Sequence, residues 1–191
     1  MMVSLRSDSP DTTRRIAAAI AGLARPGDVV LLAGEMGAGK TAFAQGFGAA
    51  IGVTDHMTSP TYNLVHSHPI GPTGKLTLHH ADVYRLSTQH EVADLALAEL
   101  AESDGIVLVE WGDVVGASLG DHLLVRLDLD LSDDHPDDDP DDDPDDDPDD
   151  DPDDDPDDAA EPTRTISVSA VGRSWATRWD RLRTALEPFA C

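Results

Sequence analysis

The sequence is poor in basic residues and in cysteine. It contains 13 Lys and Arg against 38 Asp and Glu, which gives a formal net charge of −25. A chain of this charge is a poor partner for phosphate backbones, so charge-driven binding to DNA or RNA is disfavoured. The one cysteine, Cys191, cannot form an internal disulfide, which favours a reducing cytoplasm as the location.

Long hydrophobic runs are also missing. No apolar segment approaches the ~20 residues that a membrane span needs, so we expect no membrane insertion. The apolar stretch 16–24 follows Arg14 and Arg15, as in a signal peptide. Because Arg25-Pro26-Gly27-Asp28 follows without a small-residue cleavage site, we interpret the stretch as an ordinary helix.

Most of the negative charge lies in one tract. Residues 133–158 contain 19 Asp, six Pro and one His, and the other 165 residues carry a net charge of only −6. Repulsion between aspartates, the missing N–H of proline and the absence of apolar residues predict a disordered insertion in a surface loop. Buffering of divalent cations and capture of a basic partner are the functional alternatives for this tract.

Hydrophobic patterning predicts alternating strands and helices. Short apolar runs predict strands at 29–33, 76–81 and 106–109, with another strand near 62–66. Helical periodicity predicts a helix at about 12–24, which Asp11 caps and Pro26-Gly27 stops. Further helices are predicted at about 40–51 and 88–101. A C-terminal helix is predicted to have four core residues on one face, which are Trp175, Trp179, Leu182 and Leu186. This alternation predicts a three-layer α/β fold with a mostly parallel sheet, organised as one domain over residues 1–191.

The C-terminal part follows a different pattern. Residues 123–131 and 166–170 alternate between apolar and polar residues, with no helix predicted between them. This arrangement predicts an antiparallel hairpin whose loop contains the acidic tract. A long loop costs little stability, because loop-closure entropy grows only logarithmically with length.

A phosphate-binding motif follows the first buried strand. Gly34-Glu35-Met36-Gly37-Ala38-Gly39-Lys40-Thr41 matches the pattern G-x-x-x-x-G-K-[ST] in full. The glycines let successive backbone N–H groups point into one concavity, which the next helix N-terminus completes. Lys40 can then reach the β- and γ-phosphates, and the Thr41 hydroxyl can bind Mg²⁺. The motif predicts a P-loop NTPase that binds a nucleotide with Mg²⁺.

Two acidic residues follow predicted strands. Asp82 comes after 76–81, and Glu110 comes after 106–109. Parallel strands end at the same edge of a sheet, so both carboxylates are candidates for holding Mg²⁺ or activating water, and spacing does not choose between them. His66 and His68 are two residues apart, as are His80 and Asp82, which is a spacing found in transition-metal sites. Because no cysteine or third clustered histidine accompanies them, we favour loop or hydrogen-bonding histidines over a metal site.

Missing motifs narrow the reaction. The chain has no Asn-Lys-x-Asp segment of the kind that reads guanine, which disfavours a GTPase. Arg85 and Arg126 are the only Lys or Arg residues between Lys75 and the acidic tract. A small-molecule kinase would need more arginines than this at its second phosphate site. Slow hydrolysis with a partner that completes the site is therefore expected.

Four motifs together resemble the TsaE (YjeE) family, the P-loop ATPase of bacterial tRNA threonylcarbamoyladenosine synthesis. They are the phosphate loop 34–41, Ser59-Pro60-Thr61-Tyr62, the H-x-D-x-Y-R-L segment 80–86 and Val109-Glu110-Trp111, and the likeness extends over about residues 10–131. The acidic tract just before Arg164 is a departure from the family pattern.

The resemblance implies a set of site residues. Thr41 and Glu110 would bind Mg²⁺, and Asp82 would assist hydrolysis beside the phosphates. The nucleotide-binding residues would be Gly34, Met36, Gly37, Ala38, Gly39, Lys40, Thr41, Ala42, Asp82, Asp113 and Arg164. Ser59, Thr61 and Tyr62 would form a switch-like loop, with Arg85 and Trp111 in support.

The resemblance also implies partners. The ATPase would act in the cytoplasm with TsaB- and TsaD-type subunits of the tRNA threonylcarbamoyl transferase complex. It would contact tRNA weakly or through them, and bind neither membrane nor DNA. The alternatives are a small-molecule P-loop kinase and a non-catalytic nucleotide switch.

Overall fold

A computed structural model describes residues 1–60, 64–71, 73–86, 89–103, 105–112, 119–130 and 162–191. Its centre is a seven-stranded sheet with the order β1-β7-β6-β2-β5-β4-β3. The strands are β1 (Met2–Ser7), β2 (Val29–Ala33), β3 (Val65–Ile70), β4 (Leu76–Asp82), β5 (Gly105–Glu110), β6 (His122–Leu129) and β7 (Arg164–Val171). β2, β4, β5 and β6 run parallel, whereas β3, β7 and β1 each pair antiparallel with a neighbour.

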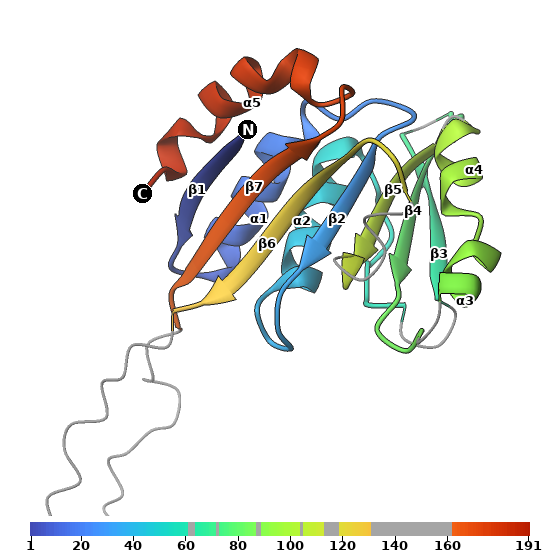
Figure 1. Cartoon of the computed structure of the whole chain (residues 1–191), viewed down its shortest axis with the longest axis horizontal. Helices are drawn as coiled ribbons and strands as arrows, with labels where there is room; N and C mark the ends of the chain where they lie inside the picture. Colours follow the sequence, from blue (N-terminus) through green and yellow to red (C-terminus); the bar gives the residue numbers. More distant parts are fainter. Residues whose placement is uncertain (61–63, 72, 87–88, 104, 113–118, 131–161) are drawn as a thin grey trace, which may run out of the picture.

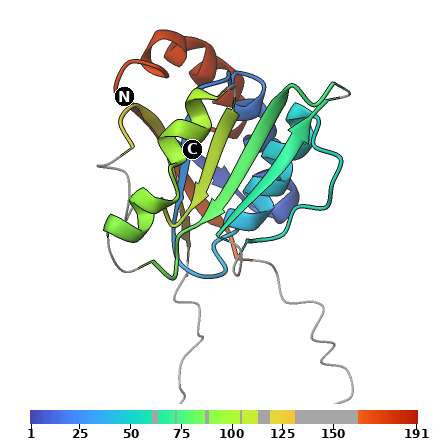
Figure 2. The same cartoon turned by 90° about the vertical axis from the view of Figure 1, so that its right-hand side faces the viewer.

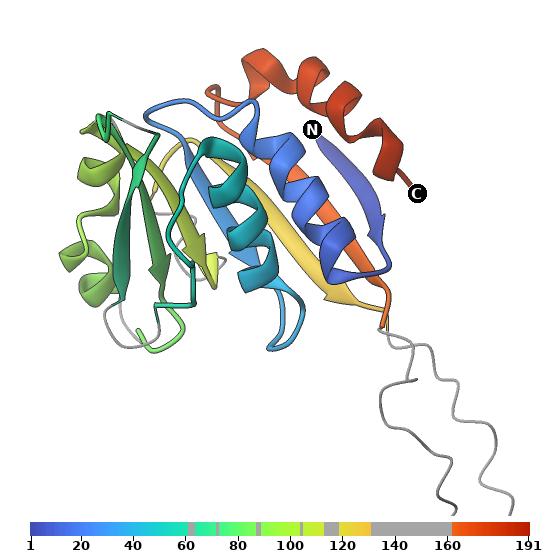
Figure 3. The same cartoon turned by 180° about the vertical axis from the view of Figure 1, so that it is seen from behind.

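Helices cover both faces of the sheet. Helices α1 (Pro10–Ala21) and α2 (Lys40–Ile51) lie on one face, and α3 (Gln89–Asp94) and α4 (Leu97–Glu102) lie on the other (Figures 1 and 2). Helix α5 (Trp179–Leu186) packs beside α1 (Figure 3), between the short 3₁₀ helices η4 (Ala176–Arg178) and η5 (Glu187–Phe189). This is an α/β fold with a mixed sheet, and no helix in the described ranges is long and apolar enough to cross a membrane.

The central strand β2 explains why helices must pack on both faces of the sheet. All five of its residues are buried. Val30 and Leu32 belong to the core beneath α1 and α2, while Val29 and Leu31 belong to the second core beneath α4. Successive side chains point to opposite faces of a strand, so an uninterrupted apolar run is stable only between two apolar layers.

Helix α1 begins earlier than predicted. Ser9, not Asp11, is the N-cap, because its Oγ accepts a hydrogen bond from the Thr12 backbone N–H at 3.2 Å. Pro10 takes the first helical position, where a missing N–H costs nothing. The helix ends at Ala21, before the predicted Pro26-Gly27 stop.

Helix α2 has the predicted bounds and packs closely on α1. A Cβ on Gly46 would lie 2.5 Å from both the Cα and the carbonyl oxygen of Arg14. Only a glycine at this position allows the two backbones to approach so closely.

Two predicted boundaries are wrong for a conformational reason. The strand expected near 62–66 begins at Val65, because Leu64 has a φ of 57° that breaks the extended conformation. The helix expected at about 88–101 is two helices, because Ala96 has a φ of 49° that interrupts the helical turn. Neither interruption has a glycine or proline to signal it. Thr88 and Tyr62 lie outside the described residues.

The two ends of the chain lie together. β1, which the sequence analysis does not predict, pairs with β7 along its whole length. β6 and β7 pair antiparallel from His122↔Val171 to Leu129↔Arg164. Trp175, Trp179, Leu182 and Leu186 are all buried in the core, but Trp175 lies before η4 and therefore outside the helix that was predicted to contain it. The acidic tract 133–158 lies outside the described residues.

Candidate functional site

A glycine loop (residues 34–39) connects β2 to α2. Three of its glycines have positive φ: 136° at Gly34, 81° at Gly37 and 100° at Gly39. A Cβ on Gly34 would collide with the Leu127 carbonyl oxygen of β6, whereas one on Gly37 would meet nothing within 4 Å. The loop therefore needs glycine at position 34 for space as well as for backbone conformation.

Lys40 is held against this loop. Although lysine rarely lies inside proteins, Lys40 is only 5% exposed. Its Nζ donates hydrogen bonds to the carbonyl oxygens of Gly34 and Glu35, both at 2.8 Å. The same Nζ lies 3.7 Å from the centre of the Trp111 ring, in a cation–π contact.

Asp82 and Glu110 meet at the carboxyl edge of the sheet. They are the last residues of β4 and β5 and are register partners in the parallel ladder. Both are buried, at 6% and 2% exposure. The predicted convergence of the two carboxylates is confirmed.

Different hydroxyl groups bind the two carboxylates. The Ser59 hydroxyl donates to Asp82 Oδ2 at 2.6 Å, and the Tyr84 backbone N–H donates to Asp82 Oδ1 at 2.9 Å. The Thr41 hydroxyl, one residue into α2, lies 3.4 Å from Glu110 Oε1 and 3.3 Å from Oε2. The glycine loop, the start of α2 and the two strand ends thus form one connected site.

A pocket of about 430 Å³ opens between these groups. It is lined by Met36, Gly37, Gly39, Lys40, Thr41, Ala42, Ser59, Asp82, Tyr84, Arg85, Glu110 and Trp111. The structure therefore brings most of the predicted site residues around one cavity.

The remaining predicted residues lie elsewhere or are not described. Gly34 and Ala38 belong to the loop but do not line the pocket. Arg164 starts β7, with its Nε 3.4 Å from the position of a Cβ on Gly39, and donates from Nη1 to the Pro162 carbonyl at 3.0 Å. Arg164 thus lies against Gly39 of the glycine loop and is not among the residues that line the pocket. Asp113, Thr61 and Tyr62 lie outside the described residues.

Trp111 has an unusual backbone. Its φ is 61°, which is costly for a large aromatic residue, and it directly follows Glu110. Its ring lies 4.7 Å from the ring of Tyr84, which is 54% exposed at the pocket rim. Sequence reasoning gave Tyr84 no role of its own, although its place two residues after Asp82 was a usable signal.

His80 is a second residue near the pocket, for which the sequence predicted no specific partner. Its Nε2 lies 2.9 Å from Glu110 Oε1, and both side chains are buried. The expectation that histidines here form hydrogen bonds is confirmed at this position. Among the described residues, no group of three or more His, Cys, Asp or Glu side chains could hold a metal ion.

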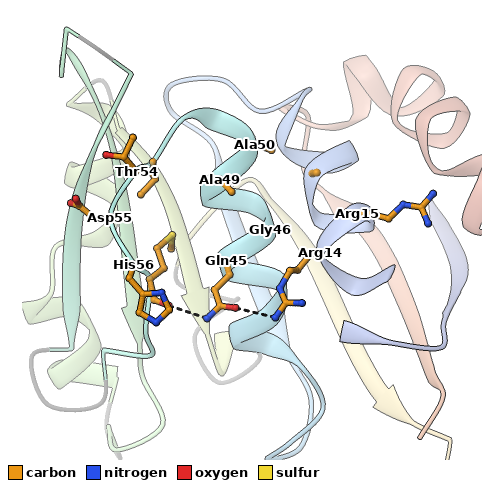
Figure 4. Close-up of a pocket in the computed structure, with 12 residues that line it drawn as sticks. Arg14, Arg15, Gln45, Gly46, Ala49, Ala50, Thr54, Asp55 and His56 are labelled. Atoms are coloured by element: carbon orange, nitrogen blue, oxygen red, sulfur yellow. Dashed lines mark hydrogen bonds between the residues drawn. The ribbon is translucent and has the colours of Figure 1, made fainter. Parts of the chain in front are cut away.

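A larger pocket, of about 730 Å³, lies away from these groups. It is bounded by α1, α2 and residues 53–57 (Figure 4). Gln45 crosses it, accepting from Arg14 Nη2 at 3.5 Å and donating to the Met57 carbonyl at 3.1 Å. None of the predicted site residues lines this pocket.

The sequence matches a known family over the segment that carries the site. The family model "Threonylcarbamoyl adenosine biosynthesis protein TsaE" matches residues 7–138, more than two thirds of the chain. The chain belongs to the TsaE family. The match includes the glycine loop, Asp82 and Glu110, and it ends before Arg164.

Individual relatives agree with this assignment. The tRNA threonylcarbamoyladenosine biosynthesis protein TsaE of Streptomyces coelicolor is 34% identical over 166 residues, covering 86% of this chain and 94% of that protein. The protein of the same name from Bacillus subtilis is 40% identical over 114 residues, covering 60% of this chain and 69% of that protein. The crystal structure of YdiB from Bacillus subtilis superposes with a TM-score of 0.61 at 25% identity, covering 98% of this chain and 95% of that chain.

Proposed function

We propose that this protein is a P-loop ATPase that acts in tRNA threonylcarbamoyladenosine biosynthesis. One observation carries the proposal: a glycine loop with a buried lysine faces two carboxylates at the ends of neighbouring parallel strands. A loop of this form, followed by a helix N-terminus, suits the phosphates of a nucleotide. Family membership supports the pathway, since the matching relatives are named for it.

The residues present fit a bound Mg²⁺. The Thr41 hydroxyl and the Glu110 carboxylate, 3.3 Å apart, are hard oxygen donors of the kind that Mg²⁺ prefers. Bound there beside the phosphates, the ion would neutralise charge that develops on the transferred group. Thr41 and Glu110 are therefore assigned to hold the metal.

The chain's own groups would do the rest. Lys40 would exchange the carbonyls of Gly34 and Glu35 for phosphate oxygens, since its ammonium already lies inside the loop. Asp82 is held at both oxygens, by the Ser59 hydroxyl and the Tyr84 N–H, so its orientation is set before a substrate arrives. We assign Asp82 to orient the attacking water.

Turnover is expected to be slow without partners. Among the residues that the structure describes, Lys40 and Arg85 are the cations that line the pocket. An additional cation from a partner is a common way to stabilise the transferring phosphoryl group. TsaB- and TsaD-type subunits are the proposed partners in the cytoplasm, and the net charge of −25 favours contact with them over direct contact with tRNA.

The fate of γ-labelled phosphate tests this proposal. Incubation with ATP and Mg²⁺ should release free inorganic phosphate, and adding TsaB- and TsaD-type subunits should increase the rate. Label on a small-molecule acceptor would instead identify a kinase. Nucleotide binding without release, with and without the subunits, would identify a non-catalytic switch.

A further inference from the structure

His80 lies directly beneath the pocket, although it does not line it. Side chains alternate along β4, so His80 shares a face with Leu78, which belongs to the core under α2, and with Asp82. The side chain of His80 is completely buried. A polar ring at such a position needs a hydrogen-bonding reason to be there.

Glu110 provides that reason. His80 Nε2 lies 2.9 Å from Glu110 Oε1, between side chains that are 0% and 3% exposed. An ionised carboxylate only accepts hydrogen bonds, so Nε2 must carry the hydrogen. Among the described residues, His80 Nδ1 has no hydrogen-bond partner, so a proton there would be a buried unpaired donor. The contacts thus favour the tautomer with its hydrogen on Nε2.

Two side chains contact the Glu110 carboxylate. His80 Nε2 lies 2.9 Å from Oε1 only, whereas the Thr41 hydroxyl lies 3.4 Å from Oε1 and 3.3 Å from Oε2. We infer that His80 is a positioning residue, which holds the Glu110 carboxylate so that Oε2 and the Thr41 hydroxyl face the same point at the pocket floor. This inference rests on the proposed function, because that point is where Mg²⁺ would bind. Groups that orient metal ligands in this way commonly change metal affinity 10- to 100-fold, roughly, when they are lost.

Substitutions of His80 test the role through metal dependence. Binding of a fluorescent ADP analogue is measured across a Mg²⁺ titration and in EDTA. His80→Leu keeps an apolar volume without a donor and should raise the half-saturating Mg²⁺ concentration about 10-fold or more, leaving affinity in EDTA unchanged. His80→Gln carries an amide N–H at the reach of Nε2 and should restore the Mg²⁺ dependence to within about threefold of the original protein. Equal behaviour of the two variants, or an unchanged Mg²⁺ dependence in His80→Leu, would overturn the inference.

A spectroscopic measurement covers the case in which the variants do not fold. Nitrogen-15 NMR of the imidazole ring in the unsubstituted protein should show hydrogen on Nε2 and a bare Nδ1. A bare Nε2, with the hydrogen on Nδ1 alone, would overturn the inference whatever the variants do. If the unsubstituted protein binds no nucleotide at all, the proposed function fails, whereas the NMR signature still decides the state of the His80–Glu110 contact.

Discussion

Lys40 links the glycine loop to the end of β5. Its ammonium contacts two carbonyl oxygens of the loop and the ring of Trp111, the residue that directly follows Glu110. A buried cation needs such partners, because moving a charged group out of water without a compensating partner costs a large free energy. Phosphate oxygens could replace these contacts without moving the lysine out of the loop.

Replacing Lys40 and Glu110 one at a time should separate nucleotide binding from turnover. Lys40→Ala should lower nucleotide affinity at least ~10-fold, because a charge-assisted hydrogen bond contributes about 1.5–3 kcal/mol. Glu110→Ala should retain nucleotide binding in EDTA but lose about 100-fold in Mg²⁺-dependent turnover. Calorimetry and phosphate release measure the two effects, with exposed Lys75→Ala as the control. Unchanged ATPase activity in Glu110→Ala would reject the metal assignment.

Gly34 and Gly27 allow a controlled comparison of how much stability is lost when a side chain replaces a glycine. Both have positive φ, but a Cβ collides with the Leu127 carbonyl only at Gly34, and meets nothing within 4 Å at Gly27. Gly27→Ala should cost about 1–2 kcal/mol from its left-handed conformation alone. Gly34→Ala should cost clearly more, in urea unfolding, because the backbone of β6 cannot move away cheaply. Similar losses at both positions would show that space next to β6 does not matter.

At the scale of whole elements, a buried ion pair fixes α5. Arg178 contacts Asp28 Oδ1 and donates from Nη1 to the Leu23 carbonyl at 2.6 Å. Asp28 Oδ2 also accepts from the Arg25 backbone N–H at 2.7 Å. The start of α5 is thereby tied to the turn between α1 and β2, far away in sequence.

Breaking this pair should be costly. Arg178→Leu leaves the Asp28 carboxylate buried without its cation and should lower the free energy of unfolding by about 3–5 kcal/mol. Arg181→Leu, at an exposed position in α5, should change the free energy of unfolding by about 0.5 kcal/mol or less. Urea unfolding of both variants makes the comparison. A small loss in Arg178→Leu would mean that the helix is held by its apolar face alone.

At the scale of the whole molecule, buried histidines should make stability depend on pH. Burial lowers the pKa of His79 and of His68 below the ordinary value of 6.5. The unfolded chain therefore binds more protons than the folded one as the pH falls below about 6.5. Stability should be fully present above that pH and be lost as the pH falls through the lowered pKa values.

A variant of His79 checks this expectation. His79→Gln keeps a partner for the Ser67 hydroxyl, which lies 2.9 Å from His79 Nδ1, but cannot take up a proton. The free energy of unfolding should therefore fall less steeply between pH 7 and pH 5, roughly, than in the unsubstituted protein. If His79→Gln keeps the original slope, desolvation of His79 does not contribute to the pH dependence.

The acidic tract should be removable without loss of the fold. The tract lies within residues 131–161, between Asp130 and Pro162. The Asp130 N–H donates to the Thr163 carbonyl at 2.8 Å, which holds the two ends of this segment together. Replacing 131–161 by a five-residue turn shortens the loop and should stabilise the protein by about 1–2 kcal/mol through closure entropy. Thermal unfolding and ATP hydrolysis measure the outcome, and a loss of folding would contradict a passive loop.

The candidate site was largely predictable because its chemistry is local. The loop 34–41 contains its own glycines, lysine and hydroxyl, and Asp82 and Glu110 directly follow apolar strands. The bond between His80 and Glu110 was not predictable in the same way. It joins residues 30 apart, and only strand pairing brings them within 2.9 Å.

The net charge, the phosphate loop, the apolar strands and the resemblance to the TsaE family followed from the sequence by itself, because composition and short-range periodicity encode them. The tertiary structure alone decided the breaks at Leu64 and Ala96, the pairing of β1 with β7 and the position of Arg164 against Gly39. Left-handed conformations at ordinary residues and contacts between distant segments depend on long-range contacts. Such contacts leave no periodic signal in the chain.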